Sequence, residues 1–255
     1  MVNKKKIAIL GGSFDPPHAA HYQLIKWLTQ DFDQVLIMPN QVSPHKLDQK
    51  PIAFYHRFHL LKLMLRELDQ YSNKKKIRNS KITLSNLEYK LPQPSFSWKT
   101  LQALRKICDH TNADFHWIIG FDQLIKLHKW SNIEYLAKNC HFTVFRRKVD
   151  ASVHVKSRFL LRSSPAKNRL LPRKTQKMLT KLGIRYTIAQ NELIDISSSE
   201  IRDFMLQKNL HSYAATNKEI AKLFGFSKEK LNVFEEKYSL TVKMIKYIKH
   251  KQLYQ

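Results

Sequence analysis

Short apolar runs alternate with longer amphipathic stretches along most of the chain. Apolar or alternating runs of strand length predict β-strands over residues 7–10, 34–38, 81–87, 115–120, 141–146 and 184–189. Apolar residues at helical spacing predict helices over 18–32, 54–68, 97–110 and 132–137, with further helices after the last strand. A polar linker, residues 71–80, separates the second helix from the third strand.

This alternation of strands and helices is typical of βαβ units. We therefore expect an α/β protein with a Rossmann-like, doubly wound parallel sheet, helices on both faces and a helical C-terminal region over 198–255. A chain of 255 residues can close such a core as one domain, and we expect residues 1–255 to do so. Ligands of these sheets bind beyond the carboxyl ends of the strands. The loops after Leu10, Met38, Gly120 and Ala189 are therefore predicted to face one crevice.

The turn after the first predicted strand, residues 11–21, has the sequence G-G-S-F-D-P-P-H-A-A-H. The chain has only five glycines, and Gly11 and Gly12 are two of them, which indicates a backbone that must approach another group closely. Asp15 is placed to cap the next helix and Pro16 to occupy its first position. His18 and His21 then share one face of the first turns, where N–H groups and the helix dipole favour a phosphate.

An ordinary turn with surface histidines is the alternative interpretation of these residues. The turn matches neither the P-loop pattern nor the dinucleotide fingerprint G-x-G-x-x-G. The glycines, the proline-started helix and both histidines together favour a phosphate site.

Composition excludes several classes of protein. A hydrophobic content of 43% is too high for a disordered chain. The two cysteines, Cys108 and Cys140, give neither a disulfide framework nor metal-ligand spacing, so we expect a reducing compartment. No apolar run reaches the length of a signal-peptide core or a membrane span. We therefore expect a cytoplasmic protein without membrane contact, and nothing in the sequence specifies an oligomeric state.

The formal net charge of +25 is spread along the chain, and only residues 148–183, which hold ten Lys and Arg against one acid, Asp150, concentrate it. We interpret this segment as an exposed basic loop or helical excursion. It is equally compatible with a solvated face and with a patch that meets nucleic acid or acidic partners. A basic nucleic-acid-binding protein on the same scaffold is therefore the alternative from a different class. Zinc-finger spacing, an RNP motif and a basic zipper are absent.

Five segments in order resemble a known family. The turn at 11–21 is similar to the H-x-G-H signature of the nucleotidyltransferase superfamily, and more closely to the G-G-[ST]-F-D-P-x-H-x-G-H of nicotinate-nucleotide adenylyltransferases. The loop ending Pro44-His45-Lys46 resembles that family's P-P-H-K. Further similar segments are P-S-F-S-W-K-T-L at 94–101, I-I-G-F-D at 118–122 with Trp130 downstream, and I-S-S-S-E-I-R at 196–202. The segment 244–254 resembles the family's terminal helix.

The resemblance implies transfer of the adenylyl group of ATP to nicotinate mononucleotide, which forms the deamido dinucleotide and pyrophosphate in NAD biosynthesis. The implied catalytic residues are His18, His21, Lys46 and Arg202. The implied ATP-binding residues are Gly11, Gly12, Ser13, Phe14, His18, His21, Gly120, Asp122, Ile196, Ser198, Ser199 and Arg202. The implied mononucleotide-binding residues are Ser13, Phe14, Lys46, Ser97, Trp98, Thr100, Trp130 and Arg147. The implied Mg²⁺ is held by ATP phosphates and water rather than by protein ligands.

Several of these residues have a structural explanation as well. Ser197 and Glu200 form a capping box, so their helix could simply be well capped. Asp122 could be a helix N-cap rather than an acceptor for a ribose hydroxyl. Trp130 could be a core residue rather than a platform for the pyridine ring. Arg146 and Arg147, at a strand end, could be solvated.

The sequence also departs from the family pattern. Ala20 stands where the family usually has glycine, and Ser43 where it usually has proline; Lys148-Val149 replaces a common Pro-Gly. Residues 207–240 add chain beyond the family core. Nicotinamide mononucleotide, or another phosphorylated acceptor such as phosphopantetheine, is the alternative substrate.

Overall fold

The computed structural model describes residues 4–44, 50–71, 81–107, 113–147, 171–193, 196–207 and 242–254. Six strands form one parallel sheet in the order β3-β2-β1-β4-β5-β6, which is the Rossmann strand order. The strands are β1 (Lys5–Gly12), β2 (Gln34–Pro39), β3 (Ile82–Leu84), β4 (Ala113–Gly120), β5 (His141–Arg147) and β6 (Tyr186–Leu193). The predicted α/β class and parallel sheet are thus confirmed.

The helices follow the strands in the predicted alternation. They are α1 (Ala19–Asp31), α2 (Phe54–Tyr71), α3 (Leu87–Lys90), α4 (Ser97–Ile107), α5 (Phe121–Lys126), α6 (Ile133–Asn139), α7 (Arg173–Lys181), α8 (Ser198–Gln207) and α11 (Val242–His250), with a 3-10 turn, η1, at Leu127–Lys129. No helix in these described ranges is both long and apolar enough to cross a membrane.

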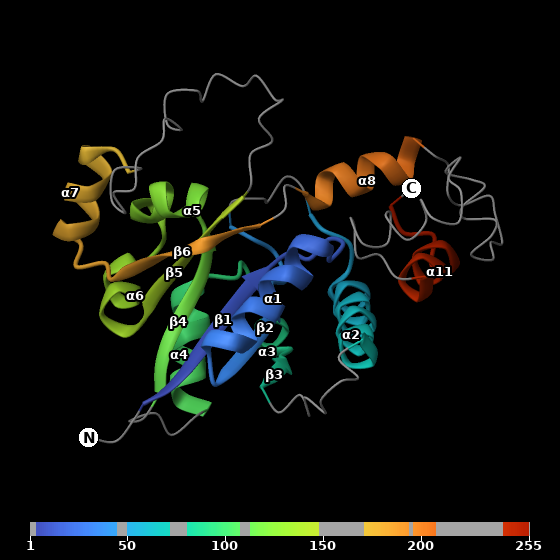
Figure 1. Ribbon diagram of the computed structural model, residues 1–255, viewed down its shortest axis with the longest axis horizontal. Helices are drawn as coiled ribbons and strands as arrows, with labels where there is room; N and C mark the ends of the chain where they lie inside the picture. Colours follow the sequence, from blue (N-terminus) through green and yellow to red (C-terminus); the bar gives the residue numbers. More distant parts are fainter. Residues whose placement is uncertain are drawn as a thin grey trace. The chain divides into compact units, whose positions relative to one another are not determined.

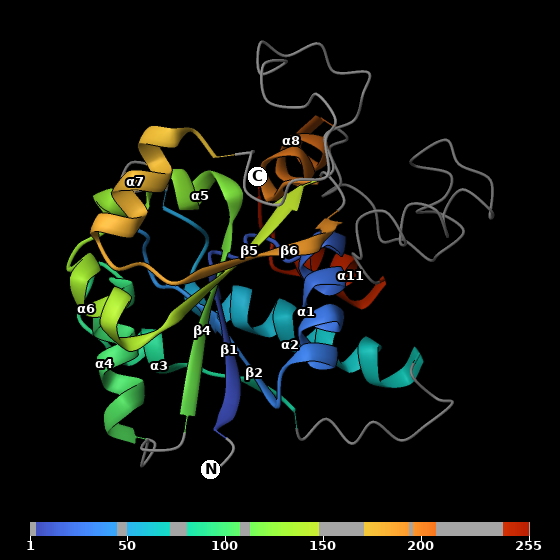
Figure 2. The ribbon, with the colours of Figure 1, turned by 60° about the vertical axis from the view of Figure 1, so that its left-hand side comes forward.

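The chain divides into two compact units, and β1 contributes to both. The first unit comprises residues 1–9 and 96–195. There β4 pairs with β1 and with β5, and β5 pairs with β6 (Figure 1). Helices α4 and α6 pack against each other (Figure 2). Phe115, Phe142 and Val144 are fully buried, as strands covered on both faces require.

The second unit comprises residues 10–95 and 196–255. Its strands β2 and β3 are parallel, and α1, α2 and α3 contact β2. Helices α2 and α11 lie side by side (Figure 1), although 170 residues separate them in the sequence. Leu60, Leu61 and Met64 of α2 and Met244 of α11 are buried. The terminal helix is thus part of the core of this unit.

Some predicted elements are wrong in extent. The strand expected over 81–87 ends at Leu84, and a four-residue helix, α3, follows. The strand expected over 184–189 runs instead over Tyr186–Leu193, through polar Gln190 and Glu192, because an edge strand tolerates polar residues. Helix α7 lies in the basic segment, whose residues 148–170 are outside the described ranges. Cys108 and residues 208–240 of the added segment 207–240 are outside them as well.

Candidate active site

The turn between β1 and α1 has a constrained backbone at Phe14. Its backbone φ of +51° lies in the left-handed region, which residues other than glycine rarely adopt. The Phe14 ring is buried and lies across Gly12, where an added Cβ would come within 3.3 Å of ring carbons. Gly12 therefore keeps room for the ring. The Phe14 ring also lies near the His21 ring, with ring centroids 4.8 Å apart and the two planes tilted.

The two histidines of the turn lie against each other. Their ring centroids are 3.8 Å apart, and the backbone N–H of His18 donates a hydrogen bond to Nδ1 of His21 (3.2 Å). Because Nδ1 of His21 accepts this bond, the neutral ring carries its proton on Nε2. His21 thus presents an N–H donor from the first turn of α1, where backbone N–H groups also lack helical partners.

The predicted cap of α1 is wrong. The helix begins at Ala19 with His18 as its N-cap, so neither Asp15 nor Pro16 has the expected position. The Asp15 carboxylate is engaged elsewhere, because its Oδ1 accepts a hydrogen bond of 2.8 Å from the Tyr254 hydroxyl. The helix therefore starts three residues later than the proline predicts, directly at the histidines.

A second helix start, that of α8, is hydrogen-bonded to the same turn. The predicted capping box is present: Ser197 N–H donates to Glu200 Oε2 (2.6 Å), and Glu200 N–H donates to Ser197 Oγ (3.2 Å). Ser198 Oγ donates to the Pro16 carbonyl oxygen (2.9 Å), which lies between the glycines and the histidines of the turn. The first turns of α1 and α8 therefore belong to one cluster in the second unit.

Arg202 links α8 to Asp15. Its Nη1 donates to the Asp15 carbonyl oxygen (2.6 Å) and lies 3.6 Å from Oδ2 of the same residue, while Nη2 donates to Ser199 Oγ (3.1 Å). The Arg202 side chain is 30% exposed, so a ligand can reach the guanidinium. The structure thus brings together five of the residues predicted to bind ATP: His18, His21, Ser198, Ser199 and Arg202.

Arg57 of α2 is a residue that the sequence patterns missed. It is 1% exposed, and its guanidinium donates to four backbone carbonyl oxygens. These belong to Ile52 (2.8 Å), Ser13 (2.7 Å), Asn40 (2.7 Å) and Gln41 (3.2 Å). Burial lowers the pKa of Arg57, and Asp15 and Tyr254 oppose that shift. Its position on the apolar face of α2, four residues before Leu61, is the sequence signal that could have found it.

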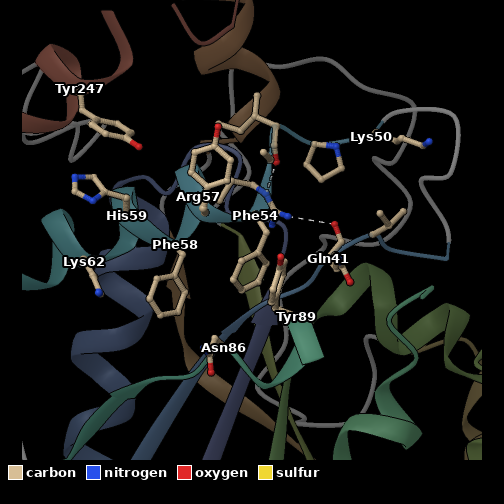
Figure 3. A pocket seen from close by; sticks show the side chains of 15 residues that line it. Gln41, Lys50, Phe54, Arg57, Phe58, His59, Lys62, Asn86, Tyr89 and Tyr247 are labelled. Atoms are coloured by element: carbon tan, nitrogen blue, oxygen red, sulfur yellow. Dashed lines mark hydrogen bonds between the residues drawn. The ribbon is translucent and has the colours of Figure 1, made fainter. Parts of the chain in front are cut away.

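A cavity of about 800 Å³ lies over the same part of α2 (Figure 3). Phe54, Phe58 and Tyr89 form aromatic walls, and Lys50 and Lys62 lie at its edge. None of the predicted site residues that the structure describes lines it. Arg57, which does line it, also donates to Ser13 O in the histidine turn.

The residues predicted to hold the mononucleotide base lie in the first unit. Ser97, Trp98 and Thr100 occupy the first turn of α4, and Trp130 follows η1. The indole Nε1 atoms of Trp98 and Trp130 are buried without a hydrogen-bond partner among the described residues. The Trp130 ring meets Phe142 edge-on, with centroids 6.3 Å apart. Each tryptophan therefore has an unused donor.

Asp122 is not the helix N-cap that its alternative explanation required. Gly120 caps α5, and Asp122 lies within the first turn with an exposed carboxylate, which accepts a bond from Gln123 Nε2 (3.0 Å). An added Cβ on Gly120 would lie 2.6 Å from Asp122 Oδ1, so the glycine leaves room for this carboxylate.

The remaining predicted residues are placed as follows. Gly11 is exposed and is the last residue but one of β1, the Ser13 carbonyl oxygen accepts a hydrogen bond from Arg57, and Ile196 is buried before α8. Nε of Arg146 is buried and has no partner within the described residues. Arg147 ends β5, and Lys46 lies outside the described residues.

Comparisons with known proteins agree with the fold. Residues 9–204 match the cytidylyltransferase-like family. A protein of Fusobacterium nucleatum described as a probable nicotinate-nucleotide adenylyltransferase is 30% identical over 226 residues, which cover 86% of this chain and 96% of that one. A protein of Shewanella frigidimarina, also described as a probable nicotinate-nucleotide adenylyltransferase, is 28% identical over 207 residues, which cover 79% of this chain and 89% of that one.

Solved structures show the same fold. The nicotinic acid mononucleotide adenylyltransferase of Plasmodium falciparum, complexed with NaAD, superposes with a TM-score of 0.62 at 21% identity, over 98% of this chain and 97% of that one. With the fold, the histidine turn and these relatives taken together, the chain belongs to the cytidylyltransferase-like family, and within it to the nicotinate-nucleotide adenylyltransferases.

Proposed function

We propose that the protein transfers the adenylyl group of ATP to nicotinate mononucleotide. An oxygen of the mononucleotide 5′-phosphate attacks the α-phosphorus of ATP, and a new P–O bond forms. The bond from the α-phosphorus to the bridging oxygen breaks, and pyrophosphate leaves with that electron pair. The products are the deamido dinucleotide and pyrophosphate. The reaction is direct, so no side chain forms a covalent intermediate.

The observation that carries this proposal is the cluster of two helix N-termini, two adjoining histidine rings and Arg202 within the second unit. Such groups offer N–H donors and positive charge to phosphate oxygens. In adenylyl transfer, negative charge is spread over the phosphoryl oxygens in the transition state, so catalysis depends on positioning and charge neutralisation. His21 Nε2–H and the Arg202 guanidinium supply these, with Ser198, Ser199 and Lys46 as further phosphate contacts.

The first unit supplies the contacts to base and ribose in this proposal. The unused indole N–H donors of Trp98 and Trp130 suit an acceptor on the pyridine ring, such as the carboxylate of nicotinate. The exposed Asp122 carboxylate suits a ribose hydroxyl. Ser97, Thr100 and Arg147 complete the mononucleotide contacts predicted in the first unit, and Ser13, Phe14 and Lys46 belong to the second.

A divalent cation would arrive with the triphosphate. In the described part of the chain, no three His, Cys, Asp or Glu side chains come together as a metal-binding group. Asp15, the carboxylate within the turn, is engaged by Tyr254 and Arg202. This donor set fits a Mg²⁺ held by phosphate oxygens and water, which is usual for Mg²⁺–ATP. When bound, the ion would neutralise phosphate charge.

The test is pyrophosphate release from ATP and Mg²⁺ with nicotinate mononucleotide, nicotinamide mononucleotide or phosphopantetheine as acceptor. We expect turnover with the first to exceed the other two. His21→Ala is expected to lower kcat by about 100-fold or more, because it removes a donor to the reacting phosphate, with an unchanged melting profile. Lys26→Ala, an exposed change on the same helix, is the control. Absence of turnover with every acceptor would exclude the proposal.

A further inference from the structure

We propose that Tyr254 is a positioning residue for ATP binding: its hydroxyl holds the Asp15 carboxylate and so leaves the Arg202 guanidinium available to the triphosphate. This inference rests on the proposed function, in which Arg202 contacts ATP phosphates. Tyr254 itself touches no substrate. It acts through two residues of the turn and of α8.

The contact that carries the inference is buried. The Tyr254 hydroxyl donates to Oδ1 of Asp15 over 2.8 Å, and the two residues are 8% and 7% exposed. The second carboxylate oxygen, Oδ2, lies 3.6 Å from Nη1 of Arg202. One carboxylate is therefore shared between a tyrosine hydroxyl and an arginine.

The hydrogen-bond donors of the Asp15 carboxylate decide how strongly it attracts Arg202. A buried carboxylate needs donors, because leaving it without them in a low-dielectric site is costly. Tyr254 satisfies one oxygen, so Arg202 does not have to neutralise Asp15 alone. Burial, and then Asp15, raise the pKa of Tyr254 well above its usual range, so the hydroxyl remains a donor at neutral pH. Without it, the carboxylate would draw Arg202 toward itself and away from a phosphate.

The backbone around Tyr254 has an unusual conformation, which places this side chain. After α11, Gln252 has a φ of +50° and Tyr254 one of +63°, both in the left-handed region that non-glycine residues rarely adopt. Backbone bonds from Gln252 N–H to Lys249 O and from Leu253 N–H to Ile248 O, both 3.0 Å, hold the chain there. Leu253, the residue before Tyr254, is buried. Two unfavourable backbone conformations thus bring the hydroxyl to Asp15.

The test compares Tyr254→Phe with a matched change on the same segment. Tyr247→Phe removes a hydroxyl that lies 2.8 Å from His56 Nδ1, away from the turn. We measure binding of Mg²⁺–ATP by titration calorimetry without an acceptor, and KM for both substrates. We expect Tyr254→Phe to weaken ATP binding and to raise the ATP KM about tenfold, which is the scale of one hydrogen bond to a charged group. The KM for nicotinate mononucleotide and the affinity of Tyr247→Phe for ATP are expected to stay unchanged.

Two further variants separate positioning from a general loss of structure. In an Arg202→Gln background, Tyr254→Phe is expected to weaken ATP binding no further, because the effect passes through Arg202. Asp15→Asn keeps an acceptor oxygen for the tyrosine and removes the charge that competes for Arg202, so it is expected to bind ATP at least as tightly as the parent protein. This variant decides the question if Tyr254→Phe does not fold.

The inference is overturned if Tyr254→Phe binds ATP like the parent protein, if it lowers kcat with both KM values unchanged, or if Asp15→Asn loses ATP affinity. Failure of the proposed function is a different result. It is absence of turnover in the unaltered protein, and the calorimetric measurement on ATP remains valid in that case.

Discussion

The guanidinium of Arg57 donates a 2.7 Å hydrogen bond to the carbonyl oxygen of Ser13, 44 residues earlier in the chain. The same Nη1 atom donates to the carbonyl oxygen of Asn40, at the end of β2, over 2.7 Å. One buried cation therefore joins the loop after β1 to the loop after β2. Each loop holds predicted contacts to substrate phosphates, so the spacing of these contacts depends on the Arg57 side chain.

Arg57→Lys is expected to lower both stability and activity. A lysine keeps the charge, but one ammonium cannot reproduce the fork that reaches four carbonyl oxygens. We expect the free energy of unfolding to fall by about 3 kcal/mol, because buried polar groups lose their partners. Urea unfolding and kcat/KM measure the two effects. Arg66→Lys, an exposed change on the same helix, should alter neither, and equal behaviour of the two variants would contradict the role of Arg57.

Gly120→Ala tests the proposed contact of Asp122 with a ribose. The φ of −78° at Gly120 suits an alanine, but the new Cβ would lie 2.6 Å from Asp122 Oδ1 and would displace the carboxylate. We expect the KM for ATP to rise about tenfold, which is the effect of losing one good hydrogen bond. The melting temperature should change little. In an Asp122→Ala background the same substitution should have no further effect. A further loss there would place the defect outside the carboxylate.

Ala20→Gly tests the departure from the family glycine in α1. Ala20 is buried in the first turn of the helix that carries both histidines, and a glycine removes its methyl group. We expect kcat/KM to be retained or raised, while stability falls by up to about 1 kcal/mol because glycine is a poor helix former. Ala19→Gly, at the neighbouring buried position, is the control. A large loss of activity in steady-state kinetics would show that the methyl group does not obstruct the nucleotide.

Stability is expected to fall below about pH 6.5 because of a histidine pair in the first unit. His116 of β4 and His141 of β5 are register partners with ring centroids 4.8 Å apart. Burial lowers the pKa of both; Lys6, Arg185 and the neighbouring histidine add to this, and Asp114 opposes it. The folded state therefore prefers the neutral rings. Their contribution to stability is present above the ordinary histidine pKa and is lost as the pH falls through the lowered values.

Urea unfolding from about pH 8 to about pH 5 measures this dependence. A variant with both His116→Gln and His141→Gln should show a shallower decline than the parent protein, whereas His128→Gln, at an exposed position, should not. The remaining slope is assigned in part to His56 and His59, whose pKa values burial also lowers. An unaltered slope in the double variant would remove the pair from the explanation.

The sequence predicts those features of the fold that local pattern determines. Residues 7–10 form a continuous apolar run because β1 is buried there, and the strand was predicted on that basis. Helix α5 was missed because it begins at Phe121, directly after the last residue of β4, with no polar spacer between them. Helix α3 has only four residues, too few to show a period.

In the candidate site, too, local motifs predict some residues, and contacts between distant parts of the chain determine others. The histidines and the capping box of Ser197 lie within short motifs, and their local geometry follows from residues three positions away. The predicted cap at Asp15 failed because its carboxylate has a partner 239 positions away, which no local pattern can show. Arg57 is a similar case, since its partners are carbonyl oxygens, which every residue type offers.

The hydrogen bond between Tyr254 and Asp15 also has a consequence during synthesis. Asp15 leaves the ribosome early, whereas Tyr254 follows after nearly all of the chain. At translation speeds of ~5–20 residues per second, this interval is on the order of tens of seconds. During this interval the nascent chain lacks the Tyr254–Asp15 bond. If ATP binding depends on this bond, as proposed, the full affinity is expected only after Tyr254 has been synthesised.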